Sequence, residues 1–103
     1  MSRVTFQPKL LSERVSLVFD FTSRLASGET ISTATTTATL FSGTDSAPSS
    51  LIFGAAAISG QTVSQLVVGG VLGVTYELLC TITTSASQTL QLSGYLVVAP
   101  NLE

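Results

Sequence analysis

The chain has 103 residues, a formal net charge of −2, no histidine and one cysteine, and only 10% of its residues are charged. The length fits one domain with its own core, while the missing histidines exclude the commonest general base and Cys/His metal clusters, and the single cysteine excludes an internal disulfide. Four cations that form no cluster do not make a nucleic-acid-binding surface, and we assign no catalytic, cofactor-binding or metal-ligating residue.

The N-terminal segment, residues 1–13, is expected to form an extended arm rather than a core strand. Pro8 limits ladder pairing, and a free arm is normally disordered. The arm carries two of the four cations and two apolar anchors, Arg3, Lys9, Phe6 and Leu10. Anchors spaced along an extended segment suit strand addition or groove docking, so we expect them to contact an adjacent subunit, with the cations facing acidic groups such as Glu77 or Asp45. The alternative is that the arm folds back over its own sandwich.

The first predicted strand covers residues 14–22. Its apolar side chains share one face, namely Val15, Leu17, Phe19 and Phe21, which is typical of a strand with one buried side. Asp20 is on the opposite face, near Arg24. We interpret these two residues either as a solvated ion pair or, if a neighbour covers the face, as specificity contacts between proteins. Both are included among the expected interface residues.

The middle of the chain predicts short strands separated by turns. Residues 30–41 form a threonine-rich strand whose inward face is ambiguous, because both registers mix threonine with apolar residues. After a loop at 42–50, strands are expected at residues 51–53, 55–58 and 61–68. The glycines at 69–73 superficially resemble a phosphate loop, but they lack the Lys-Ser/Thr pair and a following helix, so we expect a turn.

The clearest strand pattern covers residues 74–83, where apolar residues alternate with Thr, Glu and Leu. This pattern predicts a core strand with one buried face. Residues 85–87 are expected to form a hairpin loop, and residues 88–98 to return as the last strand.

Tyr76 and Cys80 are the two residues for which we predict structural roles. The Gly-Val-Thr-Tyr segment resembles the approach to a tyrosine corner, in which a tyrosine near the start of strand F bonds upstream backbone. We therefore expect Tyr76 to be buried with its hydroxyl bonded to upstream backbone. Cys80 has the inward phase and is expected to be an inert core residue. Without a partner cysteine, the antibody subclass is excluded.

About seven short strands with frequent turns predict an all-β, immunoglobulin-like β-sandwich. We expect an N-terminal arm at 1–13, the sandwich at 14–100 and a C-terminal tail at 101–103. The apolar run at 66–72 is too short to cross a bilayer, so no membrane partner is expected.

The low charge and its uneven distribution predict association between copies. All four Lys and Arg residues lie within residues 1–24, and the remainder of the chain is acidic. Surfaces covered by neighbours are depleted in charge, and a basic arm can pair with the acidic body of the next copy. We therefore expect a homo-oligomer. The alternative is a monomer solubilised by its many hydroxyl groups.

Two runs of the sequence carry recognisable short motifs. In residues 18–31 a Phe-Asp-Phe strand is followed by Arg-Leu and a Gly-Glu-Thr-Ile turn, and in residues 73–85 a Gly-Val-Thr-Tyr strand runs into Ile-Thr-Thr. Both runs resemble the fiber-tail adaptor proteins of tailed-phage virions. The resemblance covers roughly residues 14–98. It departs at the last strand, which is rich in Arg and Glu in the family but almost wholly apolar here, at residues 90–98.

The resemblance implies a ring of copies at the neck or tail that attaches fibers, with no catalytic residues to transfer. We therefore predict a non-enzymatic bacteriophage virion structural protein, made in the host cytoplasm. Its expected partners are further copies and the portal, connector, tail or fiber proteins. A capsid decoration protein that stabilises the head is the alternative within this class. A host-surface carbohydrate-binding module is the alternative from another class, although such modules favour exposed aromatic residues and the chain has no tryptophan.

Overall fold

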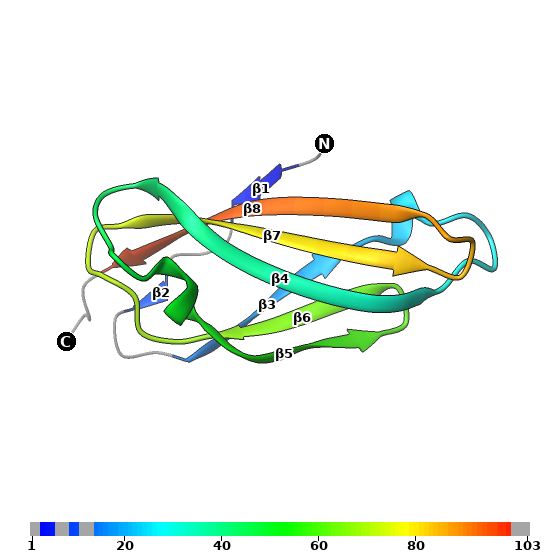
Figure 1. The fold of residues 1–103 in the computed structure, drawn as a ribbon, viewed down its shortest axis with the longest axis horizontal. Coiled ribbons are helices and arrows are strands. Elements are labelled where there is room, and N and C mark those ends of the chain that lie inside the picture. Colours follow the sequence, from blue (N-terminus) through cyan, green and yellow to red (C-terminus); the bar gives the residue numbers. More distant parts are fainter. Residues whose placement is uncertain (1–2, 6–8, 11–13, 100–103) are drawn as a thin grey trace.

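The computed structural model describes residues 3–5, 9–10 and 14–99. Strands dominate this part of the chain, and short 3₁₀ turns link them (Figure 1). The elements in chain order are β1 (Arg3–Thr5), β2 (Lys9–Leu10), β3 (Val15–Asp20), η1 (Thr22–Arg24), β4 (Ile31–Ser42), η2 (Pro48–Leu51), β5 (Ile52–Ser59), β6 (Thr62–Val67), β7 (Thr75–Thr84) and β8 (Thr89–Ala99).

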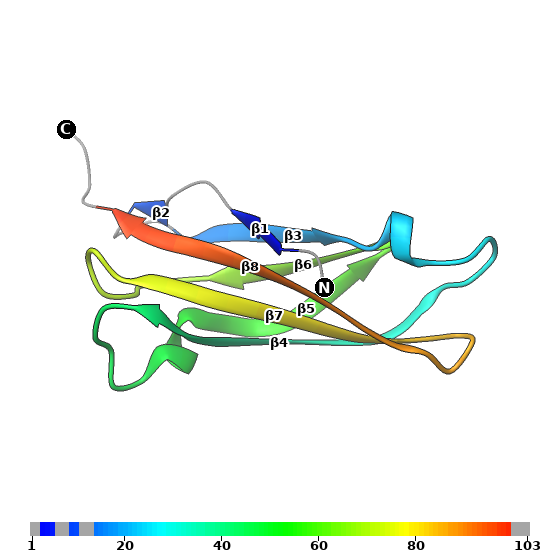
Figure 2. The ribbon, with the colours of Figure 1, turned by 90° about the horizontal axis from the view of Figure 1, so that it is seen from above.

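The strands β3 to β8 form two antiparallel sheets that pack face to face (Figure 1 and Figure 2). In one sheet β7 lies between β4 and β8, and in the other β6 lies between β3 and β5. The predicted all-β sandwich is therefore confirmed. In an immunoglobulin constant-type sandwich strand F lies between C and G, and strand E between B and D. The order of β3 to β8 supports the immunoglobulin-like assignment, which stays a prediction.

The core lies between the two sheets and is built from alternate residues of each strand. β7 alternates half-buried and buried side chains along its whole length, as expected from the period of two in a strand. Its inward apolar side chains are completely buried, namely Tyr76, Leu78, Cys80 and Ile82. Complete burial of apolar side chains of this size contributes about 1.5–3 kcal/mol each. The predicted phase of residues 74–83 is confirmed.

The inward face of β4, which was ambiguous in the sequence, is defined by its pairing with β7. Ala38 is buried, Ala34 and Thr36 are half-buried, and the threonines between them are exposed. β4 pairs regularly with β7 from Thr33 to Leu40. Since a shift of one residue would turn every side chain to the other face, pairing with β7 turns Ala34, Thr36 and Ala38 inward and the threonines between them to the surface.

β5 corrects the prediction of two separate strands at 51–53 and 55–58. It is one strand, although its register with β6 shifts between Phe53 and Ala57. Gly54 lies in this shift with a φ of +76°, a conformation that glycine adopts without the cost of a Cβ. The chain therefore bulges and continues instead of ending.

The N-terminal arm also differs from its prediction. β1 and β2 pair in parallel with β8 of the same chain (Figure 2), so the segment, for which no core strand was expected, supplies two short strands at the edge of the sheet. The described part of the arm folds back over its own sandwich, the alternative to docking on a neighbour. The physical reason is that an uncovered β8 would present a row of unpaired backbone groups. Pro8, which lacks a donor, falls between the two short strands in the sequence.

Candidate protein-interaction surfaces

Reactive groups are few in the described part of the chain. Among these residues no group of three or more Cys, Asp or Glu could hold a metal ion. Cys80 is buried, and burial raises the pKa of its thiol to about 11, although the Thr36 hydroxyl lowers it. A thiol with this pKa is protonated at neutral pH and is a poor nucleophile. No helix in residues 14–99 is long and apolar enough to cross a membrane.

Tyr76 ties two loops to one end of the sandwich. Its side chain is fully buried, and its hydroxyl accepts a hydrogen bond from the Val71 N–H (2.8 Å) and donates one to Oδ2 of Asp45 (2.6 Å). The burial and the bond to upstream backbone match the geometry predicted for Tyr76. Asp45 was suggested as a partner for the arm cations, but it also accepts a bond from the Ala47 N–H (2.9 Å). Asp45 is therefore engaged within its own subunit.

Glu29 has a comparable role at the other end of β7. It is only 7% exposed; its Oε1 accepts a bond from the Ala26 N–H (2.9 Å), and its Oε2 accepts one from the Thr84 hydroxyl. The loop before β4 is thereby fastened to the β7–β8 hairpin. The role of Glu29 could not be predicted from the sequence, because its partner Thr84 is 55 residues away.

We expect acid to destabilise the protein through three carboxylates. Hydrogen bonds lower the pKa of Asp20, Glu29 and Asp45, from the hydroxyls of Thr22, Thr84 and Tyr76 respectively. A lowered folded pKa contributes stability that is present above the unfolded pKa and is lost as the pH falls through the folded value. The unfolded values are 3.8 for Asp and 4.5 for Glu. Thermal unfolding followed by circular dichroism should have a nearly constant midpoint above about pH 5 and a falling one below it.

Glu29→Gln is the variant that checks this account. It keeps an oxygen acceptor for Ala26 but does not titrate, so its midpoint should fall less steeply with acid than that of the wild type. Equal slopes for the two proteins below pH 4.5 would contradict the role of Glu29.

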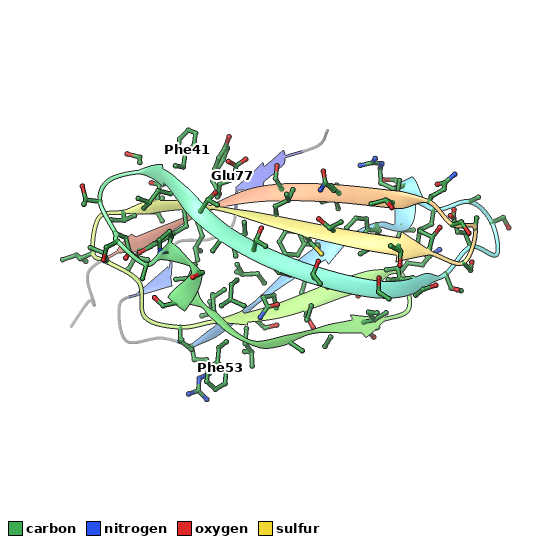
Figure 3. The ribbon with its side chains drawn as sticks, viewed as in Figure 1. Phe41, Phe53 and Glu77 are labelled. Carbon is green, nitrogen blue, oxygen red and sulfur yellow. The ribbon has the colours of Figure 1, made fainter. Side chains whose placement is uncertain are left out.

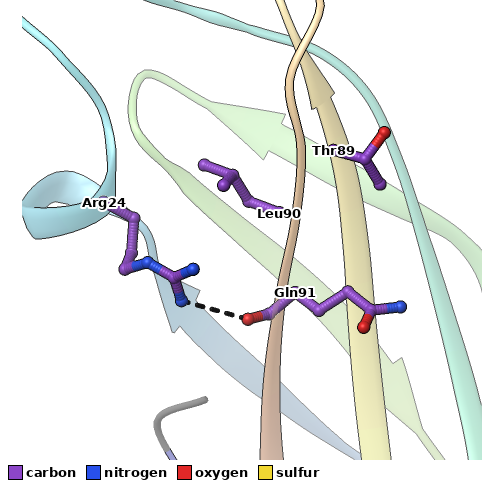
Figure 4. Close-up of a pocket in the computed structure, with 4 residues that line it drawn as sticks. All are labelled: Arg24, Thr89, Leu90 and Gln91. Atoms are coloured by element: carbon purple, nitrogen blue, oxygen red, sulfur yellow. Dashed lines mark hydrogen bonds between the residues drawn. The ribbon is translucent and has the colours of Figure 1, made fainter.

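Asp20 and Arg24 do not form the ion pair that the sequence suggested. Oδ1 of Asp20 accepts hydrogen bonds from the N–H and the hydroxyl of Thr22, whereas Nη1 of Arg24 donates to the carbonyl of Gln91 (3.2 Å; Figure 4). Asp20 ends β3 on the outer face of its sheet. The turn η1 carries Arg24 to an open groove of about 390 Å³ beside the start of β8. The two residues thus belong to different surfaces.

The arm residues expected at an interface lie along the β8 edge. Arg3 is on β1, opposite Ser93, while Lys9 and Leu10 form β2. Phe6 lies outside the described residues. The short strands β1 and β2 therefore extend the sheet beyond β8.

The outer face of the β4–β7–β8 sheet is nearly free of charge. Glu77 is the only Asp, Glu, Lys or Arg within these three strands. At one end of the face Phe41 is 59% exposed, and its ring lies against Tyr95 with centroids 4.4 Å apart. Phe41 and Glu77 lie on the same side of the sandwich (Figure 3). With Val97, which is also exposed, Phe41 and Tyr95 form what we call the Phe41 patch.

The Phe41 patch was not found from the sequence. The inward face of residues 30–41 was ambiguous, so no side chain there could be assigned to the surface. Phe41 also lies where the register with β7 shifts, between Leu40 and Ser42. Such an irregularity re-aims a side chain, and only the strand pairing reveals it.

The outer face of the β3–β6–β5 sheet carries apolar side chains where polar ones are usual. Val18, Phe53 and Leu66 are 54%, 44% and 39% exposed, and Phe53 points away from the side that bears Phe41 (Figure 3). The Arg14 guanidinium lies over the Phe53 ring, 4.4 Å from its centroid. Contiguous exposed apolar groups mark interaction surfaces, so this face is a second candidate.

β6 has a polar residue inside and an apolar residue outside. Gln65 faces the core and is 1% exposed, while the next residue, Leu66, faces solvent. The Gln65 amide is satisfied because its Nε2 donates to the carbonyls of Phe53, Gly54 and Leu66, as a buried polar group requires. The apolar outer face is thus a feature of the fold and not a displaced core.

Residues 9–97 match the model of a protein family described as podophage GP4 fiber-tail adaptor protein gp77. No curated protein matches the chain. The matched residues include the Phe41 patch, the Arg24 groove and the outer face of the β3–β6–β5 sheet.

Proposed function

The chain belongs to the podophage GP4 fiber-tail adaptor family, and from this membership we propose that it is a multi-copy, non-enzymatic adaptor that attaches fibers at the neck or tail of the virion. A member of such a family is a virion component that contacts other virion proteins. The observation that carries the proposal is the extent of the match, because residues 9–97 contain β2 to β7 and all but the last two residues of β8.

The Phe41 patch supports this proposal as a contact surface for a fiber or tail protein. Aromatic residues are enriched, and charged residues depleted, at the centres of protein interfaces, and aromatic anchors dominate their binding energy. The patch pairs two aromatic rings on strands β4 and β8, and the strands β4, β7 and β8 together contain one charged residue, Glu77. We propose that Phe41 is the anchor, because it is the most exposed large apolar side chain that the structure describes.

Two further surfaces, which contain residues expected at an interface from the sequence, are proposed to contact neighbouring proteins. Arg24 lies in an open groove, where a guanidinium can bind a carboxylate of a neighbouring protein. Arg3 on β1 and Lys9 and Leu10 on β2 lie at the extended sheet edge, where a strand of a neighbour can add, and we propose that Phe6 also takes part in this contact. The portal, connector, tail and fiber proteins are the proposed neighbours.

The proposal is tested with phage that lack this chain and are complemented with wild type or variants. Particles without the chain should keep filled heads and tails but lose their fibers, as counted by electron microscopy. Phe41→Asp should form a folded protein and leave most fiber sites empty, because loss of a hot-spot anchor costs 2 kcal/mol or more, about a thirtyfold loss of affinity. Thr37→Asp is the matched control, since Thr37 is exposed on the same face away from the patch, and it should restore fibers.

Other outcomes favour the alternatives. Heads that open or lose DNA while fibers remain would indicate capsid decoration. Fully fibered particles that no longer adsorb to the host would indicate carbohydrate binding. Fibers on particles that lack the chain would contradict the adaptor proposal.

A further inference from the structure

The outer face of the β3–β6–β5 sheet has rows of large and small side chains at right angles to its strands. Cross-strand neighbours have their side chains on the same face. One row consists of Ser16, Leu66 and Phe53, and the next consists of Val18, Ser64 and Ala57. In the first row the side chain on β3 is small and those on β6 and β5 are large. In the second row the side chain on β3 is large and those on β6 and β5 are small.

Opposite charges lie at the two ends of this face. Arg14 and Asp20 are the only charged residues in β3, β5, β6 and the residue that precedes β3. They are six positions apart along one strand, so both project from the same face as Val18. Oδ1 of Asp20 is occupied by Thr22, which leaves Oδ2 for another donor. The face is thus positive at one end, negative at the other and uncharged between them.

We propose that this face binds the same face of a second copy of the chain, with the strands of the two copies antiparallel across a two-fold axis. Arg14 of each copy then meets Asp20 of the other, and the first row of one copy lies on the second row of the other. Phe53 packs on Ala57, Leu66 on Ser64 and Val18 on Ser16. Each large side chain meets a small one, the arrangement by which packed layers interdigitate and aligned sheets stack.

The charges select this orientation against the other face-to-face alignment. If the strands of the two copies were parallel, the two-fold axis would run along them, β3 of one copy would lie on β5 of the other, and Leu66 would meet Leu66. Arg14 and Asp20 would then face β5, which has no charged residue, and a charge buried in an interface without a partner opposes binding. An isologous interface needs a self-complementary patch, and the antiparallel alignment provides it in charge and in size. The Arg14 side chain leaves the Phe53 ring to reach the second copy, and the ring then packs on that copy.

This inference rests on the proposed multi-copy adaptor and names a surface by which its copies associate. Sedimentation velocity of the purified full chain tests it. Wild type should form dimers reversibly. Arg14→Asp and Asp20→Arg should each weaken the dimer at least about tenfold, because each variant places like charges in both contacts. An equimolar mixture of the two variants should form a heterodimer, and the double variant Arg14→Asp/Asp20→Arg should dimerise again, since both restore opposite charges.

Two further variants separate the interface from folding. Asp20→Asn keeps an oxygen acceptor for Thr22 and removes only the charge, so it should fold and dimerise more weakly. Ala57→Trp should abolish the dimer by colliding with Phe53 of the second copy. Thr37→Asp, on the other sheet, should leave the dimer unchanged. Circular dichroism establishes that each variant is folded.

The inference is wrong if wild type stays monomeric up to about 1 mM, or if the mixed variants remain monomers. The fibers on complemented particles distinguish this failure from that of the adaptor proposal. If wild type is monomeric but its particles carry normal fibers, the interface alone is wrong. If wild type is dimeric but particles that lack the chain still carry fibers, the adaptor function alone is wrong.

Discussion

Gly70→Ala is expected to lower the free energy of unfolding by about 2–5 kcal/mol, the sum of backbone strain and overpacking. Gly70 has a φ of +94°, and an added Cβ would lie 2.8 Å from Cγ2 of Val98 and 3.2 Å from Cδ1 of Leu51. Both contacts are with buried core side chains that cannot yield without disturbing their neighbours. Urea or guanidinium unfolding followed by circular dichroism measures the change.

Gly69→Ala is the matched control for this prediction. Gly69 also has a positive φ, +62°, but an added Cβ there meets nothing within 4 Å. Its cost should be the strain alone, about 1–2 kcal/mol. Equal losses for the two variants would show that the contacts with Val98 and Leu51 contribute nothing.

Tyr76→Phe is expected to cost about 1–3 kcal/mol, because the Val71 N–H and Oδ2 of the half-buried Asp45 both lose their hydrogen bond to the buried hydroxyl. The hydroxyl links the Val71 N–H to the Asp45 carboxylate, and phenylalanine removes both bonds while keeping the ring. In an Asp45→Ala background the same change should cost less, since the bond from the Tyr76 hydroxyl to the carboxylate is then already absent. A double-mutant cycle with these variants measures that coupling. Additive losses would contradict it.

The same tyrosine predicts a loss of stability in alkali. Burial, and then the bond to Asp45, raises the pKa of Tyr76 to about 12 from an ordinary value of 10.0. A raised folded pKa contributes stability that is complete below the unfolded pKa and is lost as the pH rises through the folded one. Wild type should therefore lose stability between pH 10 and pH 12. Tyr76→Phe should lose less over that range.

The strand and core assignments that succeeded from the sequence rest on local patterns. Residues 74–83 alternate in hydrophobicity, and every inward position of β7 is buried as that alternation predicts. Tyr76 was recognisable because the tyrosine corner is a short motif with a defined place in the strand. Cys80 follows from the same phase. Such features depend only on neighbours along the chain.

The hydrogen bonds that could not be predicted from the sequence join residues that are far apart in the chain. Asp45 bonds Tyr76 across 31 positions, and Glu29 bonds Thr84 across 55. Asp20 and Arg24, only four positions apart, were considered as a pair but separate at η1. The geometry of the folded loops determines which donor a carboxylate bonds, and distance along the sequence does not predict that donor.

The sequence by itself therefore determined the all-β class, the central core strand, and the burial of Tyr76 and Cys80 within it. These follow from composition and from a period of two, which are properties of the chain before it folds. The tertiary structure decided the return of the arm to β8, the outward threonines of β4, the exposed Phe41, and the apolar outer face around Leu66. Each of these depends on which strands pair and in what register, and a shift of one residue in that register would exchange surface for core.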